Sequence, residues 1–140
     1  MSITGNVERG SIVWCTLPPT KGREQNGCRA SIVISEGFID STLNKMALTV
    51  PVTTNAMGHS FEISVPPGIK TPDSHLLPPH LQFPELEGVV LINNVRSIDL
   101  DGRNAIVIGR VDPESEFFEE IVDNVMGLIA YPEDDEKTED

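Results

Sequence analysis

The chain is 140 residues long, which fits a single domain built around one hydrophobic core. Apolar residues make up 39% of it, which argues against wholesale disorder, and its apolar runs are too short to span a bilayer. Two cysteines are too few for a disulfide framework or a cysteine-rich zinc site. The N-terminus has no apolar segment typical of a secretory signal, so we expect a cytoplasmic protein without a membrane partner.

The formal net charge is −12, which by itself disfavours a nucleic-acid binder, but the charge is unevenly distributed. From residue 112 onward there are 12 acidic residues and one base, Lys137, whereas residues 1–111 carry 9 bases and 10 acids. The body is therefore nearly neutral, and a local cationic groove within it remains compatible with the composition. The acidic tail, 132–140, is expected to be disordered.

Short runs of β-branched and apolar residues, bounded by turn residues, predict strands. The run at 30–35 is apolar and is typical of a central strand, whereas 60–65 alternates and predicts a half-exposed one. The strong strand at 88–92 continues through 93–99 with polar residues interleaved. The expected strands are 11–17, 30–35, 46–52, 60–65, 88–99 and 105–111.

A proline-rich segment, 66–87, interrupts this series of strands. Six of the 11 prolines lie in it, and this composition cannot form a strand or helix of any length. We therefore expect a long surface loop, a kind of segment that is often functional. His75 and His80 are expected at its surface rather than at a metal ion, because no ligand cluster accompanies them. Four apolar side chains are able to pack against the body: Leu76, Leu77, Leu81 and Phe83.

A helix is predicted over 113–130. Asp112 is a candidate cap, proline follows in the first turn, and apolar residues recur at helical spacing from Phe117 to Ile129. Strands followed by one helix, without βαβ alternation, favour a mainly β fold, an antiparallel barrel or strongly bent sheet with the helix packed on it. Residues 1–131 would form this single domain.

The segment 21–29 carries cations, an amide and a carboxylate between two predicted strands. Such groups can hold an anion and move a proton. Lys21, Glu24, Gln25 and Arg29 are the residues of interest here. A solvated hairpin loop is the alternative interpretation, because Gly22, Asn26 and Gly27 supply ordinary turn chemistry.

No metal-binding or nucleotide-binding motif is present, so no cofactor is expected. Phosphoryl chemistry without a metal needs a cation for the phosphate, donors for the charge of the transition state, and an acid–base group. Arg29, Thr53 and Glu24 could supply these three functions in that order. The alternative is structural, with Thr53 as a turn or cap residue and Arg96 in a surface ion pair.

Six sequence blocks occur in a fixed order along most of the chain, and together they resemble the MazF/PemK family, the toxins of bacterial type II toxin–antitoxin pairs. The blocks are RGSIVW at 9–14, LPPTKGREQ at 17–25, GCR at 27–29, VPVTTN at 50–55, FEI at 61–63 and GVVLINNVRSID at 88–99. Each block alone is weak, but their order makes the signal specific.

The resemblance implies an SH3-like antiparallel barrel of the CcdB/PemK/MazF type with a C-terminal helix. It also implies a homodimer and a cognate antitoxin partner. The activity it implies is metal-independent, sequence-specific cleavage of single-stranded RNA, by attack of the 2′-hydroxyl on the adjacent phosphate. The products would be a 2′,3′-cyclic phosphate and a 5′-hydroxyl.

The family's catalytic arginine and threonine correspond to Arg29 and Thr53, and its loop glutamate in the RNA path corresponds to Glu24, the candidate base. Asn93 and Asn94 correspond to the pair that touches RNA bases. In the PemK branch, catalytic roles are also given to residues corresponding to Arg96 and Asp99. The expected RNA-binding residues are Lys21, Gln25, Asn55, Asn93, Asn94, Arg96 and Asp99.

This chain departs from the family pattern at several places. Ala30 replaces the proline after the arginine, Asn93 and Asn94 replace an acid and a glutamine, and the loop 66–87 is longer. A non-catalytic MazF-like module that binds RNA or protein is therefore an alternative. A gyrase-poisoning toxin of the similar CcdB fold is a third possibility, but that family works through apolar residues at its C-terminus, and this chain ends in Thr-Glu-Asp.

Overall fold

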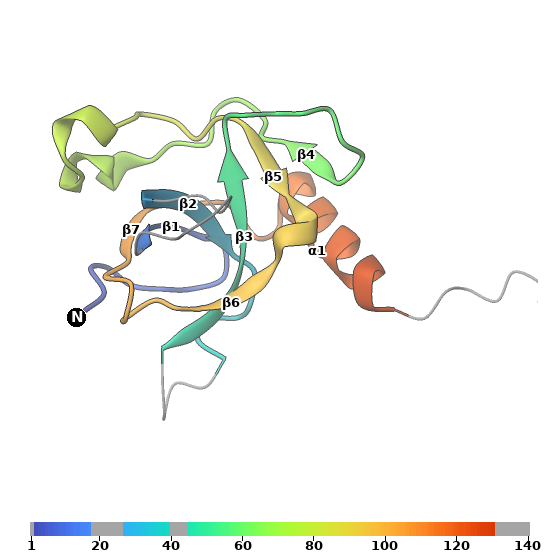
Figure 1. Ribbon diagram of the computed structural model, residues 1–140, viewed down its shortest axis with the longest axis horizontal. Helices are drawn as coiled ribbons and strands as arrows, with labels where there is room; N and C mark the ends of the chain where they lie inside the picture. Colours follow the sequence, from blue (N-terminus) through green and yellow to red (C-terminus); the bar gives the residue numbers. More distant parts are fainter. Residues whose placement is uncertain (1, 18–26, 40–44, 131–140) are drawn as a thin grey trace, which may run out of the picture.

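The computed structural model describes residues 2–17, 27–39 and 45–130, with the backbone alone at 16, 17 and 27–29. These residues form strands, one α-helix and short 3-10 helices (Figure 1). The strands are β1 (Ser11–Leu17), β2 (Gly27–Val33), β3 (Met46–Thr53), β4 (Glu62–Ser64), β5 (Val89–Leu91), β6 (Arg96–Asp99) and β7 (Ile106–Arg110). The helices are η1 (Pro72–Leu76), η2 (Pro79–Leu81), η3 (Ile92–Asn94) and α1 (Glu116–Ile129).

The strands form one antiparallel sheet in the order β4-β5-β3-β2-β1-β7, and β6 also pairs with β3. This confirms the predicted mainly β class with a terminal helix. Over the described residues the ladder runs from β4 to β7 without closing into a ring. The sheet is strongly bent (Figure 1), and α1 contacts η3, the turn that directly follows β5.

The strands at the centre of the sheet are buried on both faces. Successive side chains of a strand point to opposite faces. In β1, Ile12 belongs to the larger core cluster, whereas Val13 and Cys15 belong to a smaller cluster behind the sheet. In β2, Ile32 and Val33 divide in the same way. This explains why residues 12–15 of β1 and 32–33 of β2 are consecutive apolar residues rather than alternating ones.

Strand β3 organises the sheet because β2 pairs with one edge of it and both β5 and β6 pair with the other. Thr49 lies opposite Arg96 and Val52 lies opposite Val90. The chain between the two partners on the β5–β6 side is therefore longer than the chain between Thr49 and Val52, and the extra residues form the helical turn η3. The prediction of one strand over 88–99 is therefore wrong. The chain breaks at η3 because β5 and β6 pair with different parts of β3.

Strand β2 begins at Gly27, earlier than the predicted start at residue 30, because its backbone stays paired with β1 as far as Leu17 opposite Gly27. Arg29 therefore lies within a strand, opposite Cys15, and not in a loop. The position of Arg29 along the sheet is set by backbone pairing on the β1 side.

The N-terminal cap of α1 is Ser115, whose hydroxyl accepts a 3.2 Å hydrogen bond from the Phe118 N–H. Asp112, the predicted cap, instead accepts a bond from the Glu114 N–H in the preceding turn. Phe118 and Ile121 are fully buried, and α1 contacts η3. Within the described part of the chain, no helix has the length and apolar character needed to cross a membrane.

The proline-rich segment 66–87 is an ordered cover over one end of the sheet, projecting above β1 and β2 in Figure 1. Leu77 is buried, and Leu81 and Phe83 pack against the main core. Leu76 remains 47% exposed, so the expectation that it packs against the body is wrong. It lies at the end of η1, and the buried Ser74 and Leu77 on either side of it hold the segment to the body.

Replacing Phe118 by alanine should lower the free energy of unfolding by about 3–5 kcal/mol, because a large buried ring is lost and a cavity remains. Asp123→Ala, on the exposed face of the same helix, should change it by less than about 0.5 kcal/mol. Urea unfolding of both variants measures the difference. Equal effects would mean that α1 does not contribute its apolar face to the core.

Candidate functional site

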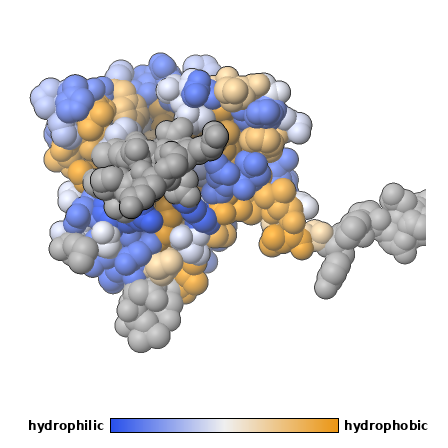
Figure 2. Space-filling view, viewed as in Figure 1, coloured by the Kyte–Doolittle hydropathy of each residue, from blue (hydrophilic) through white to orange (hydrophobic). Residues whose placement is uncertain are grey.

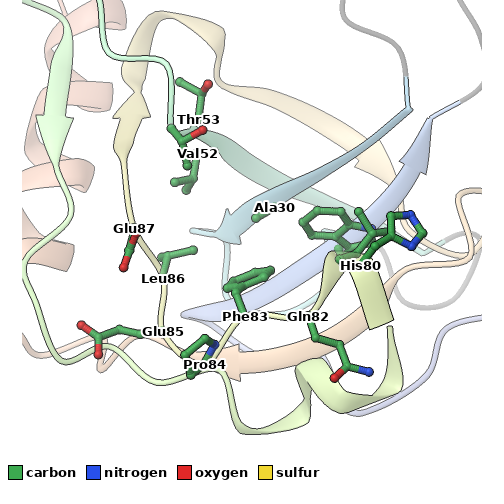
Figure 3. Close-up of a pocket in the computed structure, with 13 residues that line it drawn as sticks. Ala30, Val52, Thr53, His80, Gln82, Phe83, Pro84, Glu85, Leu86 and Glu87 are labelled. Carbon is green, nitrogen blue, oxygen red and sulfur yellow. The ribbon is translucent and has the colours of Figure 1, made fainter. Parts of the chain in front are cut away.

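A pocket of about 540 Å³ opens between the ends of β2 and β3 and the last part of the proline-rich loop (Figure 3). Trp14, Ala30, Val52, Thr53 and Thr54 form its strand side. The loop contributes the opposite side. The loop residues are His80, Leu81, Gln82, Phe83, Pro84, Glu85, Leu86 and Glu87.

The strand side is formed by residues that lie opposite one another on the neighbouring strands β1, β2 and β3. Trp14 lies opposite Ala30, and Ala30 lies opposite Val52. Just beyond this last pair of the β2–β3 ladder, Arg29 precedes Ala30 in β2 and Thr53 follows Val52 as the last residue of β3. Neighbouring strands lie about 5 Å apart. The backbone register thus places Thr53 at the pocket and Arg29 on the neighbouring strand, one residue before the pocket residue Ala30.

The Thr53 hydroxyl accepts a 3.1 Å hydrogen bond from the Asn55 N–H. The predicted structural role of Thr53 in a turn is therefore present. A hydroxyl also has one proton to donate, and that of Thr53 is not given to any other described residue. Because its oxygen is held by the turn and its side chain lines the pocket, Thr53 can serve as an oriented donor.

Gly88 is the residue that lets β5 approach Thr53. Its φ is +116°, and a Cβ added there would lie 2.2 Å from the Thr53 carbonyl oxygen. No other residue type fits without displacing the end of β3. Sequence reasoning marked Gly88 only as the start of a strand, because the contact with Thr53 is visible only in three dimensions.

The loop side of the pocket is fixed by a compact set of hydrogen bonds. The buried hydroxyls of Thr71 and Ser74 each donate a 2.6 Å bond to the Phe83 carbonyl. The Gln82 amide donates to the Leu77 carbonyl at 2.8 Å. As a result the Phe83 ring lies 5.9 Å, centre to centre, from the Trp14 ring.

The rim of the loop side is acidic. Glu85 accepts a 2.7 Å bond from the Gly68 N–H and pairs with Lys70 at 3.5 Å. The bond from Gly68, helped by the nearby Lys70 charge, lowers the pKa of the Glu85 carboxyl below its ordinary value. Glu87 is exposed and makes no hydrogen bond or ion pair with the described residues. Neither acid was predicted as part of a site.

The remaining predicted residues are spread along the sheet. Asn93 and Asn94 are exposed in η3, beside β3. Arg96 lies opposite Thr49, about 13 Å along β3 from Thr53. It makes no ion pair with the described residues, so the predicted surface ion pair is not seen there.

Asp99 lies opposite Met46, about 23 Å along β3 from Thr53, and it accepts a 3.1 Å bond from the Gly102 N–H. Within one chain, therefore, neither Arg96 nor Asp99 meets Thr53. Lys21, Glu24, Gln25 and the acidic tail 132–140 lie outside the described residues. Among the residues that are described, no group of three or more His, Cys, Asp and Glu side chains could hold a metal ion.

A family model described as PemK-like, MazF-like toxin of type II toxin–antitoxin system matches residues 8–126. This chain belongs to that family. The endoribonuclease toxin MazF of Escherichia coli strain K12 is 34% identical over 107 residues, 76% of this chain and 81% of the relative. The endoribonuclease toxin ChpB of the same strain is 33% identical over 103 residues, 73% and 78% of the two chains.

Solved structures agree with this assignment to the MazF-like toxins. MazF from Deinococcus radiodurans has a TM-score of 0.64 at 25% identity, covering 89% of this chain and 98% of that one. A MazE–MazF structure from the same organism has a TM-score of 0.60 at 25% identity, covering 87% and 94%. The predicted resemblance to the MazF/PemK family is confirmed.

Gly88→Ala should destabilise this MazF-like toxin by more than Gly58→Ala, because only the first places a Cβ against the Thr53 backbone. Gly58 also has a positive φ, +80°, but has nothing within 4 Å, so its substitution should cost about 1 kcal/mol of backbone strain. Chemical unfolding of the two variants tests this. Similar losses would show that the approach of Gly88 to Thr53 is not tight.

Proposed function

We propose that this chain is the toxin of a type II toxin–antitoxin pair and acts as a metal-independent endoribonuclease on single-stranded RNA in the cytoplasm. Its family membership and its relatives named as endoribonuclease toxins support the proposal. The observation that supports it most directly is the register of β2 and β3: the ladder's last pair is Ala30 with Val52, Arg29 precedes Ala30, and Thr53 follows Val52 and lines a pocket.

The proposed reaction is an internal displacement at one phosphodiester. The ribose 2′-oxygen forms a bond to the adjacent phosphorus, the bond to the 5′-oxygen breaks, and a 2′,3′-cyclic phosphate and a 5′-hydroxyl result. Arg29 carries a permanent charge and two donors that fit a phosphate, so it stabilises the charge that builds there. Thr53 donates its hydroxyl proton in a hydrogen bond to a phosphate oxygen.

Two proton transfers complete the balance. Glu24 is the candidate base that accepts the 2′-hydroxyl proton, and the leaving 5′-oxygen takes up a proton from solvent while Arg29 remains charged beside the phosphate. The other proposed contacts bind the RNA on either side of the scissile phosphate. They are Lys21, Gln25, Asn55, Asn93, Asn94, Arg96 and Asp99. The distances of Arg96 and Asp99 from Thr53 along β3 favour contacts to RNA remote from the reacting phosphate within the same chain.

Arg29→Ala should reduce cleavage of single-stranded RNA in EDTA at least about a hundredfold while leaving the fold intact, because it removes the main electrostatic stabilisation of the transition state. Thr53→Val should have a smaller effect in the same direction. Mapping of the RNA ends by gel and mass spectrometry measures both. Arg110→Ala, an exposed arginine on β7, is the matched control and should cleave normally. Full activity of Arg29→Ala would refute the assignment.

A non-catalytic RNA- or protein-binding module is the second candidate, favoured by Ala30 after the arginine and by the acidic charge. The same assay separates the two functions. A module that only binds would retain RNA without producing ends, and the Arg29→Ala variant would then differ from the parent chain in affinity alone.

We further propose that the toxin forms a homodimer and is bound by a cognate antitoxin. The MazE–MazF structure from Deinococcus radiodurans supports an antitoxin partner. The end of α1 offers a surface for such contacts, because its large apolar residues gather there in the open (Figure 2). Met126, Leu128 and Ile129 are 56%, 53% and 79% exposed. Light scattering of the toxin alone, and with its antitoxin, tests both associations.

Removal of residues 132–140 should raise RNA affinity at low salt, because the segment carries six acids and one base and repels phosphates over a Debye length of about 10 Å at 0.1 M salt. Fluorescence anisotropy with a non-cleavable oligonucleotide, titrated over salt, measures this effect. The gain should shrink as salt increases. An affinity unchanged at every salt concentration would count against a repulsive tail.

A further inference from the structure

The pocket beside Thr53 has a side that the proposed chemistry does not use. Its far wall comes from the proline-rich loop, and hydrogen bonds within the loop hold this wall in one conformation. The Phe83 carbonyl receives two short bonds from buried hydroxyls, and the neighbouring Gln82 is tied to the Leu77 carbonyl. The loop therefore holds the Phe83 ring in place before any ligand arrives.

Two aromatic rings meet where this wall joins the strand side of the pocket. Trp14 and Phe83 both line the pocket, both are partly exposed, and their planes are inclined by 51°. Inclined rings of this kind form a corner in which one face of a flat, unsaturated ligand can stack on one ring while its edge meets the other. The pocket volume of about 540 Å³ also suits a small aromatic group with attached polar atoms.

The charges of the lining argue against a phosphate on the loop side. No lysine or arginine is among the described residues that line the pocket, whereas Glu85 and Glu87 are. Lys70 is paired with Glu85 rather than directed at a ligand. A phosphate is repelled by such a rim, but the exocyclic amino group of a nucleobase is a donor that a carboxylate accepts. The phosphate would instead lie on the strand side, near Thr53.

We propose that the proline-rich loop, through Phe83 and together with Trp14, forms a stacking subsite for a nucleobase flanking the scissile phosphate of the RNA substrate. This inference rests on the proposed endoribonuclease function and makes the loop a determinant of the cleavage sequence. It also explains why the loop is braced by internal hydrogen bonds, since a wall that reads a base must keep its position. Figure 3 shows Phe83 and Thr53 on opposite sides of the same pocket.

The test uses short RNA that contains 2-aminopurine, whose fluorescence falls on stacking, with 2′-O-methyl groups that prevent cleavage. For the unaltered protein we expect quenching when the label lies next to the mapped cleavage site. Phe83→Ala should weaken binding roughly tenfold and lose the quenching. In cleavage of unmodified RNA it should raise KM with little change in kcat, because stacking binds substrate and transition state alike.

Two control variants separate loss of the stacking ring from a general effect on the loop or on folding. Leu76→Ala removes an apolar side chain from the same loop but outside the pocket, and it should bind, quench and cleave like the unaltered protein. Phe83→Tyr keeps a ring and should restore quenching, which a general loss of folding in Phe83→Ala would not explain. Unchanged affinity and quenching in a folded Phe83→Ala protein would overturn the proposal.

The binding measurement does not depend on catalysis. Quenching by a protein that cleaves no RNA would support the subsite and contradict the nuclease. Cleavage without any quenching next to the mapped site would support the nuclease and contradict the subsite.

Discussion

The approach of Gly88 to the Thr53 carbonyl is the contact on which the candidate site depends. Strand β3 ends at Thr53, and β5 must pass close to that end in order to pair with Val52 and Thr53. Only a residue without a Cβ can do so here. The backbone of Thr53 is therefore positioned by the sheet, and its hydroxyl oxygen is held by the Asn55 N–H of the following turn, which is the arrangement that a preorganised donor requires.

The proline-rich loop is also held in a fixed position, but by hydrogen bonds within the loop rather than by strand pairing. Among the described residues, its one strand-like pairing is the bridge between its own Lys70 and Glu85, so internal hydrogen bonds take the place of a strand ladder. Two prolines begin its 3-10 turns, where a missing N–H does no harm. Thr71 and Ser74 then direct their hydroxyls inward to one carbonyl. A segment that composition alone marks as irregular is in this way held against the core.

The sequence was sufficient for the fold class because the inner strands are uninterrupted apolar runs and the helix has a clear periodicity. It was insufficient where the boundaries of a strand depend on how it pairs with a neighbouring strand. Residues 88–99 look like one strand, and only the register against β3 exposes the extra turn at η3. Residue types and family resemblance pointed to Thr53, but the contact of Phe83 with Trp14 joins segments far apart in the chain and leaves no local signal.

The charges that line the pocket bear on how a substrate could lie in it. The described lining of the pocket includes Glu85 and Glu87 but no lysine or arginine, so its charge disfavours a phosphate on the loop side. In the proposed complex the RNA therefore has one favoured orientation, with its backbone toward the strands and a base toward the loop. Glu85 and Glu87 repel the phosphate backbone in the reversed orientation. In the proposed complex these acids therefore lower the overall affinity for RNA but help to align it.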